Sequence, residues 1–241
     1  MISAFAVPGL PEISAGDDLA ALLRPSVEDG DVVVLAHKIV SKAEGRVVEL
    51  DAVTPSPRAV ALSRELGKDD PRHVQVVLDE TAEVVRAERG VLISRTHHGF
   101  VCANAGVDAS NAVDGTLVLL PRDPDASARA SRAALGVRCA VVIADSFGRA
   151  WRNGQADVAI GVAGLAPLDD WRGRTDAHGR ELRASVIAIA DEAASAADLA
   201  RRGKDSREPA VILRGLAHHL TDDDGPGIAP LLRARDEDLF T

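Results

Sequence analysis

The chain contains no tyrosine, and its other aromatic residues are two Trp and four Phe among 241 residues. A nucleotide base or an aromatic cofactor would therefore be held mainly by backbone groups, arginine planes and aliphatic side chains. Two cysteines, Cys102 and Cys139, are too few for a disulfide framework and have no CxxC spacing for zinc. We expect both thiols to stay reduced as small core residues.

The chain also lacks an excess of basic residues and any long apolar run. The formal net charge of −9 argues against a nucleic-acid partner, because phosphate neutralisation needs a basic face. No stretch of 18 uncharged apolar residues occurs, and the N-terminus has no basic segment followed by an apolar core. We therefore expect a cytoplasmic protein without a membrane partner.

Two common phosphate-binding fingerprints are missing. The sequence has no GxGxxG motif, and Gly203-Lys204 is followed by Asp205 where a P-loop needs Ser or Thr. A nucleotide site in this chain is therefore neither a P-loop nor a Rossmann site.

Hydrophobic residues make up 46% of the chain, which is enough for a sizeable core. Helical periodicity follows a capping signal at Asp17-Asp18 and recurs in longer segments, while short β-like runs lie between them. The expected longer helices are 56–67, 69–88 and Glu181 to Arg202, and the expected strands are 31–36, 46–50, 91–94, 116–120, 140–144 and 210–213.

These elements mix without a regular βαβ alternation, so the pattern predicts an α+β fold of mixed short strands with helices. Between the first two strands we expect only a polar turn. Residues 1–241 are interpreted as a single unit, built as one domain or as two lobes.

Two apolar segments of the sequence end in carboxylate side chains. The stretch "FVCANAGVDASN" ends with Asp108, Ser110 and Asn111, and "VVIADSFGR" presents Asp145 and Ser146 where we expect its strand to end. Carboxylates flanked by hydroxyl and amide groups are hard oxygen ligands suited to Mg²⁺ or Mn²⁺. The alternative is an ordinary strand-end turn at each position.

The segment "HKIVSKAEGR" carries the complementary positive charge. Lys38, Lys42 and Arg46 follow the first strand and would suit a phosphate, although a solvated turn is the alternative.

Six segments of the chain are long and distinctive: "GLPEI" (9–13), "HKIVSKAEGR" (37–46), "HGFVCANAGVDASN" (98–111), "LLPRDPDASA" (119–128), "ADSFGRAWRNGQADVAIGVAGL" (144–165) and "PAVILRGL" (209–216). Together, and in this order, they resemble the coenzyme F420:L-glutamate ligase family over nearly the whole chain. The resemblance is to the stand-alone form, without the C-terminal nitroreductase-like domain of some relatives.

The resemblance implies a GTP-dependent amide ligase that adds L-glutamate to coenzyme F420-0 and then extends the γ-glutamyl tail. It also implies two divalent ions, Mg²⁺ or Mn²⁺, together with K⁺, and an intertwined homodimer. The GTP contacts carried over by position are Leu10, Pro11, Glu12, Ile13, His37, Lys42, Asn111, Gly203, Lys204 and Ser206. The metal ligands carried over are Asp108, Asp145, Ser146 and Asp205, and the catalytic candidates are Lys42 and Arg149.

Such a ligase would transfer the γ-phosphoryl of GTP to the F420-0 carboxylate, and the glutamate nitrogen would displace phosphate from the acyl phosphate. Arg149 or Arg152 would stabilise the moving phosphoryl, and the alternative for either residue is a salt bridge. Two other functions use the same residues. One is a metal-dependent phosphohydrolase acting on a nucleotide, and the other is a GTP-binding protein without catalysis.

The shortage of aromatic rings generates a prediction about base selectivity. Guanine must be distinguished from adenine by hydrogen bonds to the base edge, from backbone groups near Leu10 to Ile13. We expect kcat/KM to be much higher for GTP than for ATP, and steady-state kinetics with the two nucleotides measure this ratio. Equal values would mean that the base is not read.

Overall fold

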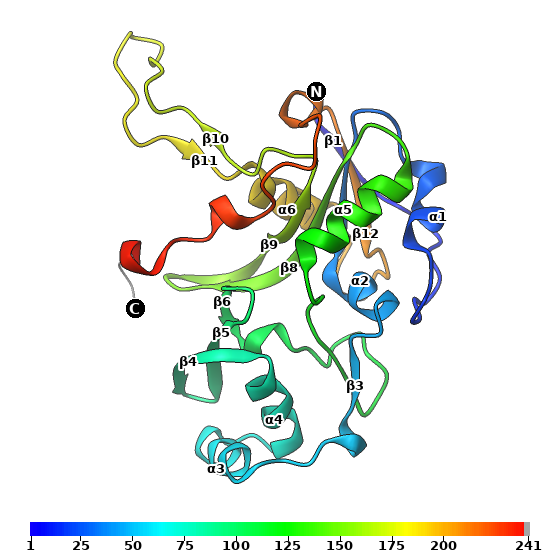
Figure 1. Ribbon diagram of the computed structural model, residues 1–241, viewed down its shortest axis with the longest axis vertical. Coiled ribbons are helices and arrows are strands. Elements are labelled where there is room, and N and C mark those ends of the chain that lie inside the picture. Colours follow the sequence, from blue (N-terminus) through cyan, green and yellow to red (C-terminus); the bar gives the residue numbers. More distant parts are fainter. Residues whose placement is uncertain (239–241) are drawn as a thin grey trace.

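A five-stranded sheet forms the centre of the protein, in the order β1-β12-β2-β8-β9. The computed structural model describes residues 1–238 (Figure 1). Strands β2 and β8 are parallel, and the other neighbours are antiparallel. The strands are β1 Ser3–Ala6, β2 Val32–Ala36, β8 Ala140–Arg149, β9 Arg152–Ala163 and β12 Ala210–Arg214.

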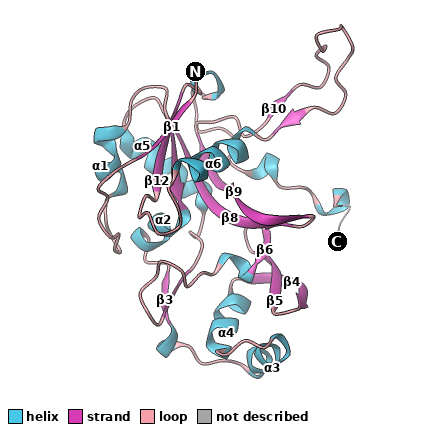
Figure 2. Cartoon of the chain, turned by 180° about the vertical axis from the view of Figure 1, so that it is seen from behind, coloured by secondary structure: helices cyan, strands magenta, loops and turns pink. Residues whose placement is uncertain are grey.

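Helices cover both faces of this sheet. Helix α5 (Pro124–Leu135) and helix α6 (Ile189–Ala200) lie on opposite faces, with the short α1 (Leu19–Leu23) beside α5 (Figures 1 and 2). Because both faces are covered, the central strand β2 is apolar at every position and its residues 32–35 are fully buried.

A second, smaller hydrophobic cluster lies below the sheet in Figure 1 and includes Leu66, Val77, Leu92 and Leu117. It is enclosed by two helices, by a three-stranded sheet in the order β4-β5-β6 and by the antiparallel pair β3-β7. These elements are β3 Val47–Glu49, α3 Pro57–Leu66, α4 Pro71–Asp79, β4 Thr81–Glu88, β5 Val91–Thr96, β6 Val101–Ala103 and β7 Thr116–Val118.

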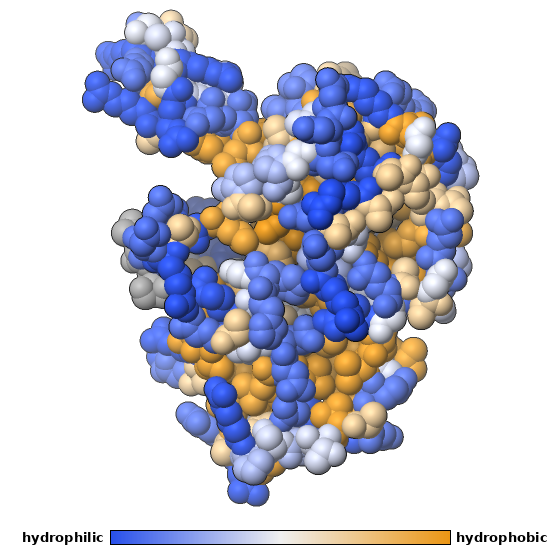
Figure 3. Space-filling model, viewed as in Figure 1, coloured by the Kyte–Doolittle hydropathy of each residue, from blue (hydrophilic) through white to orange (hydrophobic). Residues whose placement is uncertain are grey.

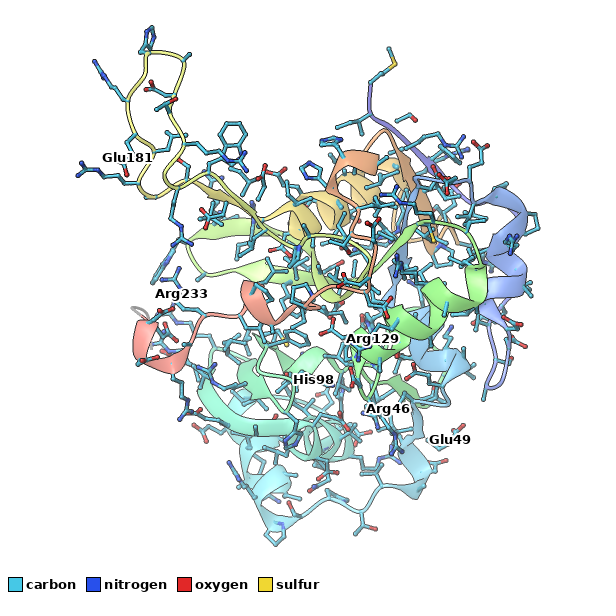
Figure 4. The ribbon with its side chains drawn as sticks, turned by 45° about the horizontal axis from the view of Figure 1, so that its top comes forward. Arg46, Glu49, His98, Arg129, Glu181 and Arg233 are labelled. Carbon is cyan, nitrogen blue, oxygen red and sulfur yellow. The ribbon has the colours of Figure 1, made fainter. Side chains whose placement is uncertain are left out.

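A two-stranded arm projects from the body. It consists of β10 (Asp169–Asp170), β11 (Val186–Ile187) and the segment 171–185 between them. Figure 3 shows the arm as a largely hydrophilic projection separated from the body by a notch, and Figure 4 places Glu181 on it, far from the sheet.

Most of the predicted elements are confirmed, as is the mixture of helices with several sheets. The strands predicted at 31–36, 46–50, 91–94, 116–120, 140–144 and 210–213 correspond to β2, β3, β5, β7, β8 and β12. The helix predicted at 56–67 is α3, which begins after the N-cap Ser56 with Pro57 and ends at the left-handed Gly67.

Four of the local predictions were wrong. The expected polar turn after β2 is the helix α2 (His37–Ala43), in which Ile39 and Val40 face the core. The helix expected over 69–88 ends at Asp79, because the β-branched residues that follow pair with β5 as strand β4.

The helix expected from Glu181 begins only at Ile189. The residues before it form the return strand of the arm, with Val186 and Ile187 paired to β10. Strand β8 does not end before Asp145 but continues to Arg149, because β9 pairs with it along its polar half.

Both cysteines are free and buried. Burial, with a contribution from Asp145, raises the pKa of the Cys102 thiol to about 12. No helix in residues 1–238 is long and apolar enough to cross a membrane.

Candidate active site

A cavity of about 910 Å³ opens where the ends of β2 and the middle of β8 meet several loops. Seven segments contribute to its wall: the loop after β1, the end of β2 with the start of α2, the loop before β7, strand β8, strand β9, the end of α6, and the loop before β12. Every GTP-contact and metal-ligand residue expected from the sequence lines this cavity. They are Leu10, Pro11, Glu12, Ile13, His37, Lys42, Asp108, Asn111, Asp145, Ser146, Gly203, Lys204, Asp205 and Ser206.

Asp108 is half-buried and held by a charged partner. Lys38 Nζ lies 2.6 Å from Asp108 Oδ2, and the backbone N–H of Ser110 donates to Asp108 Oδ1 at 2.7 Å. Burial alone would raise the pKa of this carboxyl, but the hydrogen bonds from Lys38 and Ser110 outweigh burial and hold the pKa below its ordinary value. Asp108 is therefore an anion that faces the cavity at neutral pH.

Lys42 joins three of the segments. Its ammonium group pairs with the carboxylate of Glu12 and donates to the backbone carbonyl of Asn111 at 2.9 Å. Asn111 has a left-handed backbone with φ of 54°, which asparagine tolerates better than most residues. Its side-chain amide donates to the carbonyl of Lys204 at 3.2 Å, and so ties the loop before β7 to the loop before β12.

Asp145 and Ser146 stand within β8, beside the first residue of α2. His37 Nε2 lies 3.4 Å from Asp145 Oδ1, and the backbone N–H of Ser146 donates to that same oxygen at 2.8 Å. The His37 side chain is 2% exposed, so the side chain packs as part of the cavity floor and not as a mobile surface group.

Asp157 is a cavity residue that sequence reasoning missed. It lies on β9, is 2% exposed, and accepts a hydrogen bond from the hydroxyl of Ser146 at 2.5 Å. Arg201 Nη1 donates to its other oxygen at 2.5 Å. The available signal was a single carboxylate in an otherwise apolar stretch, "ADVAIGVAGL", because a buried strand accepts a charge only when the charge is paired.

Lys204 contacts the pair formed by Ser146 and Asp157. Its ammonium donates to Ser146 Oγ at 2.5 Å and lies 3.8 Å from Asp198 Oδ1. Two side-chain nitrogens of Arg201, Nε and Nη2, are buried with no hydrogen-bond partner among the described residues. Since an unpaired buried donor is costly, these nitrogens suit an anionic ligand.

Two residues considered at the sequence level lie away from the cavity. Arg149 is at the exposed tip of the β8–β9 hairpin, where it donates to the backbone carbonyls of Asn153 and Gly154. Arg46 turns to the smaller cluster, where it pairs with Glu80 at 2.7 Å and donates to the carbonyl of Leu120. Neither side chain lines the cavity.

The oxygen-rich wall fits a divalent ion completed by other ligands. No group of three or more His, Cys, Asp or Glu side chains is gathered as a metal site within residues 1–238. Mg²⁺ commonly uses only one or two carboxylates, and takes its remaining ligands from water and substrate phosphates. The ammonium groups of Lys38 and Lys204 contact Asp108 Oδ2 and Ser146 Oγ. Both oxygens therefore already bind a cationic group at the cavity wall.

The comparisons with known proteins identify the class to which this chain belongs. A family model described as F420-0:Gamma-glutamyl ligase matches residues 9–215. The chain is 44% identical over 250 residues to the coenzyme F420:L-glutamate ligase of Methanothermobacter thermautotrophicus, covering 99% of this chain and 98% of that protein.

Two further relatives carry the same name. The protein of Methanopyrus kandleri is 45% identical, covering 97% of this chain and 95% of its own, and that of Natronomonas pharaonis is 46% identical, covering 98% and 93%. The chain belongs to the F420-0:gamma-glutamyl ligase family.

Asp157 generates a prediction for this site. Asp157→Asn removes the charge that pairs with Arg201 and turns an NH₂ group toward one of the two donors, so Ser146 loses its fixed orientation. We expect kcat/KM to fall about 10- to 100-fold and the Mg²⁺ concentration needed for half-maximal rate to rise. Metal-titrated kinetics measure both quantities.

Asp191→Asn is the matched control. Asp191 lies on α6, accepts one hydrogen bond from the backbone N–H of Ala159 at 2.9 Å, and burial raises its pKa. Asparagine keeps that acceptor, so we expect little change. Equal effects of the two substitutions would contradict a specific role for Asp157.

Proposed function

We propose that this chain is a GTP-dependent coenzyme F420:L-glutamate ligase, which joins L-glutamate to F420-0 and then extends the γ-glutamyl tail. One observation carries the proposal. Residues from five segments, expected from the family resemblance to bind GTP and metal, all line a single cavity in a chain that belongs to the F420-0:gamma-glutamyl ligase family.

The cavity wall combines basic side chains with carboxylates, and this combination supports a nucleoside triphosphate bound together with a divalent ion as the cosubstrate. The basic side chains are Lys38, Lys42, Lys204, Arg201 and Arg207. Arg201 has two nitrogens without a hydrogen-bond partner among the described residues, and a guanidinium group at this wall suits phosphate oxygens. Guanine would be read by backbone groups of residues 10–13, since no Phe, Trp or Tyr within residues 1–238 lines this wall.

Amide formation needs an activated acyl group, because a carboxylate oxygen is a poor leaving group. In the first step, a carboxylate oxygen of F420-0 bonds to the γ-phosphorus of GTP and the bond from that phosphorus to the bridging oxygen breaks, releasing GDP. Arg201 and the lysines of the wall stabilise the negative charge that spreads over the transferring phosphoryl. This role, assigned to Arg149 from the sequence, falls more naturally to Arg201.

In the second step, the nitrogen of L-glutamate bonds to the acyl carbon and the carbon–oxygen bond to phosphate breaks. Inorganic phosphate leaves with the electron pair, and the original ammonium group gives up two protons in all, to phosphate or solvent water. Fixing the two reactants in one cavity supplies much of the rate by removing the entropy of their encounter.

Asp108, Asp145, Ser146 and Asp205 would hold Mg²⁺ or Mn²⁺. Such ions would neutralise the clustered phosphate charge and align the transferring group. Asp157 would keep the proton of Ser146 turned away from the ion, leaving an oxygen lone pair for it. The use of K⁺ rests on the family resemblance.

Mass spectrometry of F420-0 incubated with GTP, Mg²⁺ and L-glutamate tests the ligase directly. We expect products heavier by successive glutamyl residues, and we expect Asp145→Asn to lower the rate at least about a hundredfold at low metal while the fold survives. Asp51→Asn, at an exposed carboxylate paired with Arg72, is the control and should keep the full rate.

Near-normal turnover of Asp145→Asn at low metal would contradict the metal assignment. Phosphate release from GTP that proceeds equally well without L-glutamate would favour the phosphohydrolase. Binding of GTP without any turnover would favour the non-catalytic alternative.

We also propose a homodimer. The apolar runs of the chain do not supply the dimer surface, because they are buried within the chain: α6 packs Ala190, Ala193, Ala194 and Ala197 onto the sheet, and the run 157–168 starts within strand β9. Support comes instead from the projecting arm, where Trp171, directly after β10, and Ile187, in β11, are 39% and 37% exposed. A protruding arm of this kind is suited to wrapping a second copy.

Light scattering at low micromolar concentration tests the dimer. We expect a mass near twice 25.2 kDa that persists on modest dilution, since an intertwined interface is large. A fully active species with the mass of one chain would refute the dimer without affecting the ligase proposal.

A further inference from the structure

The chain passes twice between the central sheet and the smaller cluster. The first crossing, residues 44–46, leads from α2 to β3, and the return crossing, residues 119–123, leads from β7 to α5. Arg46 ends the first crossing. Its backbone N–H donates to the carbonyl of Ser41 in α2 at 2.7 Å, and its carbonyl accepts from the N–H of Leu119 at 3.0 Å. The two crossings therefore lie side by side at Arg46.

The side chain of Arg46 brings a third segment to this junction. Its Nε–H donates to the carbonyl of Leu120 in the return crossing at 3.0 Å, and its Nη2 lies 2.7 Å from Glu80 Oε2 at the end of α4. The Arg46 and Glu80 side chains are 15% and 19% exposed, so water reaches little of the pair. Removing either partner would leave a largely buried charged group unpaired, which is costly.

His98 holds the return crossing from the side of the smaller cluster. It lies in the turn between β5 and β6, and its Nε2 donates to the carbonyls of Pro121 at 2.9 Å and of Arg122 at 3.1 Å. A carbonyl oxygen only accepts, so the proton is on Nε2. Figure 4 shows Arg46 and His98 in the region between α5 and the smaller cluster.

Asp108 is attached to the same junction through the backbone. Its N–H donates to the carbonyl of Val118 at 3.0 Å, and the N–H of Val118 donates back at 2.9 Å. Val118 pairs in turn with Val47, the residue after Arg46. About two strand spacings, or about 10 Å, therefore separate the backbone of Asp108 from the junction. Asp145 stands on β8 of the central sheet, so the junction lies between the supports of the two carboxylates.

Two other ion pairs across the junction are less shielded. Asp108 is 41% exposed in its pair with Lys38, and Arg235 and Glu83, which also contact each other, are both exposed. Exposed pairs contribute little to holding two parts of a chain in one arrangement. The shielded contacts of Arg46 are better suited to that task.

We propose that Arg46 is a positioning residue, which sets the separation of Asp108 from Asp145 and thereby the affinity of the site for divalent ions. The inference rests on the proposed function, because it takes both carboxylates as metal ligands. Arg46 does not line the cavity, so it acts through the placement of these ligands. A misplacement of about 1 Å can cost about a hundredfold in rate, even when the substitution lies far from the reacting atoms.

The first test measures metal binding without turnover. Mn²⁺ alone is titrated into the intact protein, and the free ion is followed by its electron paramagnetic resonance signal. Arg46→Met keeps an apolar stem but removes the donors to Leu120 and Glu80. We expect the dissociation constant for Mn²⁺ to rise at least about tenfold. An unchanged dissociation constant would overturn the proposal.

Conservative substitutions grade the effect. Arg46→Lys keeps the charge but lacks the planar fork that reaches two acceptors at once, and Glu80→Gln keeps an acceptor but loses the charge. Both should bind Mn²⁺ more tightly than Arg46→Met and more weakly than the unsubstituted protein. Affinity in Arg46→Lys no better than in Arg46→Met would count against the role of the charge pair.

Arg132→Met is the matched control. Arg132 is also 15% exposed, pairs with Asp224 at 2.7 Å, and donates from Nε to the carbonyl of Cys139 at 2.9 Å. All three residues lie after the return crossing, beside the central sheet. We expect a loss of thermal stability similar to that of Arg46→Met, with no change in Mn²⁺ affinity. Equal losses of affinity in the two variants would mean that Arg46 acts only through overall stability.

The second test measures the positioning itself. Nitroxide labels at Glu65→Cys in α3 and Ala21→Cys in α1 report the separation of the smaller cluster from the central sheet, because both positions are exposed. The two native cysteines are buried and are shielded from the label. Pulsed double electron–electron resonance should give a shifted or broadened distance distribution for Arg46→Met and an unchanged one for Arg132→Met. The reverse pattern, or no change in either, would overturn the proposal.

The unsubstituted protein separates the two levels of proposal. If it binds no Mn²⁺ and forms no glutamyl product, the proposed function itself fails. If it does both, while Arg46→Met keeps its Mn²⁺ affinity and its distance distribution, only the role of Arg46 fails.

Discussion

The parallel pairing of β2 with β8 is the contact on which the rest of the site depends. Its register places Ala36 opposite Ala144, so the next residues along the two strands, His37 and Asp145, are neighbours. Both strands are buried and apolar up to this point, and a slip of one residue would turn the buried side chains to the wrong faces. The carboxylate is thus positioned by the core and not by a flexible loop.

Much of the fold could be predicted because local patterns and global structure agree. Apolar β-branched runs became β2, β5 and β12, and the cap and proline signals at residues 56–57 marked the start of α3. The errors arose where pairing partners overrode local preference. Residues 81–88 have helix-like periodicity, yet they form β4 because β5 lies beside them, and no local signal reports that neighbour.

The same distinction applies to the site. Asp108, Asp145, Lys42 and Asn111 were identifiable because each belongs to a peculiar stretch of sequence. Asp157 and Arg201 were not, since 44 positions separate them and their importance comes from a buried contact between β9 and the end of α6. Arg149 is close to Ser146 along the chain, but β8 carries it outward to a hairpin tip. Arg149 therefore lies outside the cavity although it is only three residues from Ser146.

The connection between β2 and β8 has a consequence for the kinetics of folding. Residues 37–139, including the entire smaller cluster, lie between two strands that must become neighbours in the sheet. Closing so long a loop costs entropy before any contact rewards it, and folding through such distant pairings is slow. The smaller cluster draws on contacts within residues 48–119 and is able to form earlier. The cavity lined by Asp108 and Asp145 then forms only at the final closure, so chains arrested before it have a formed smaller cluster but an incomplete candidate site.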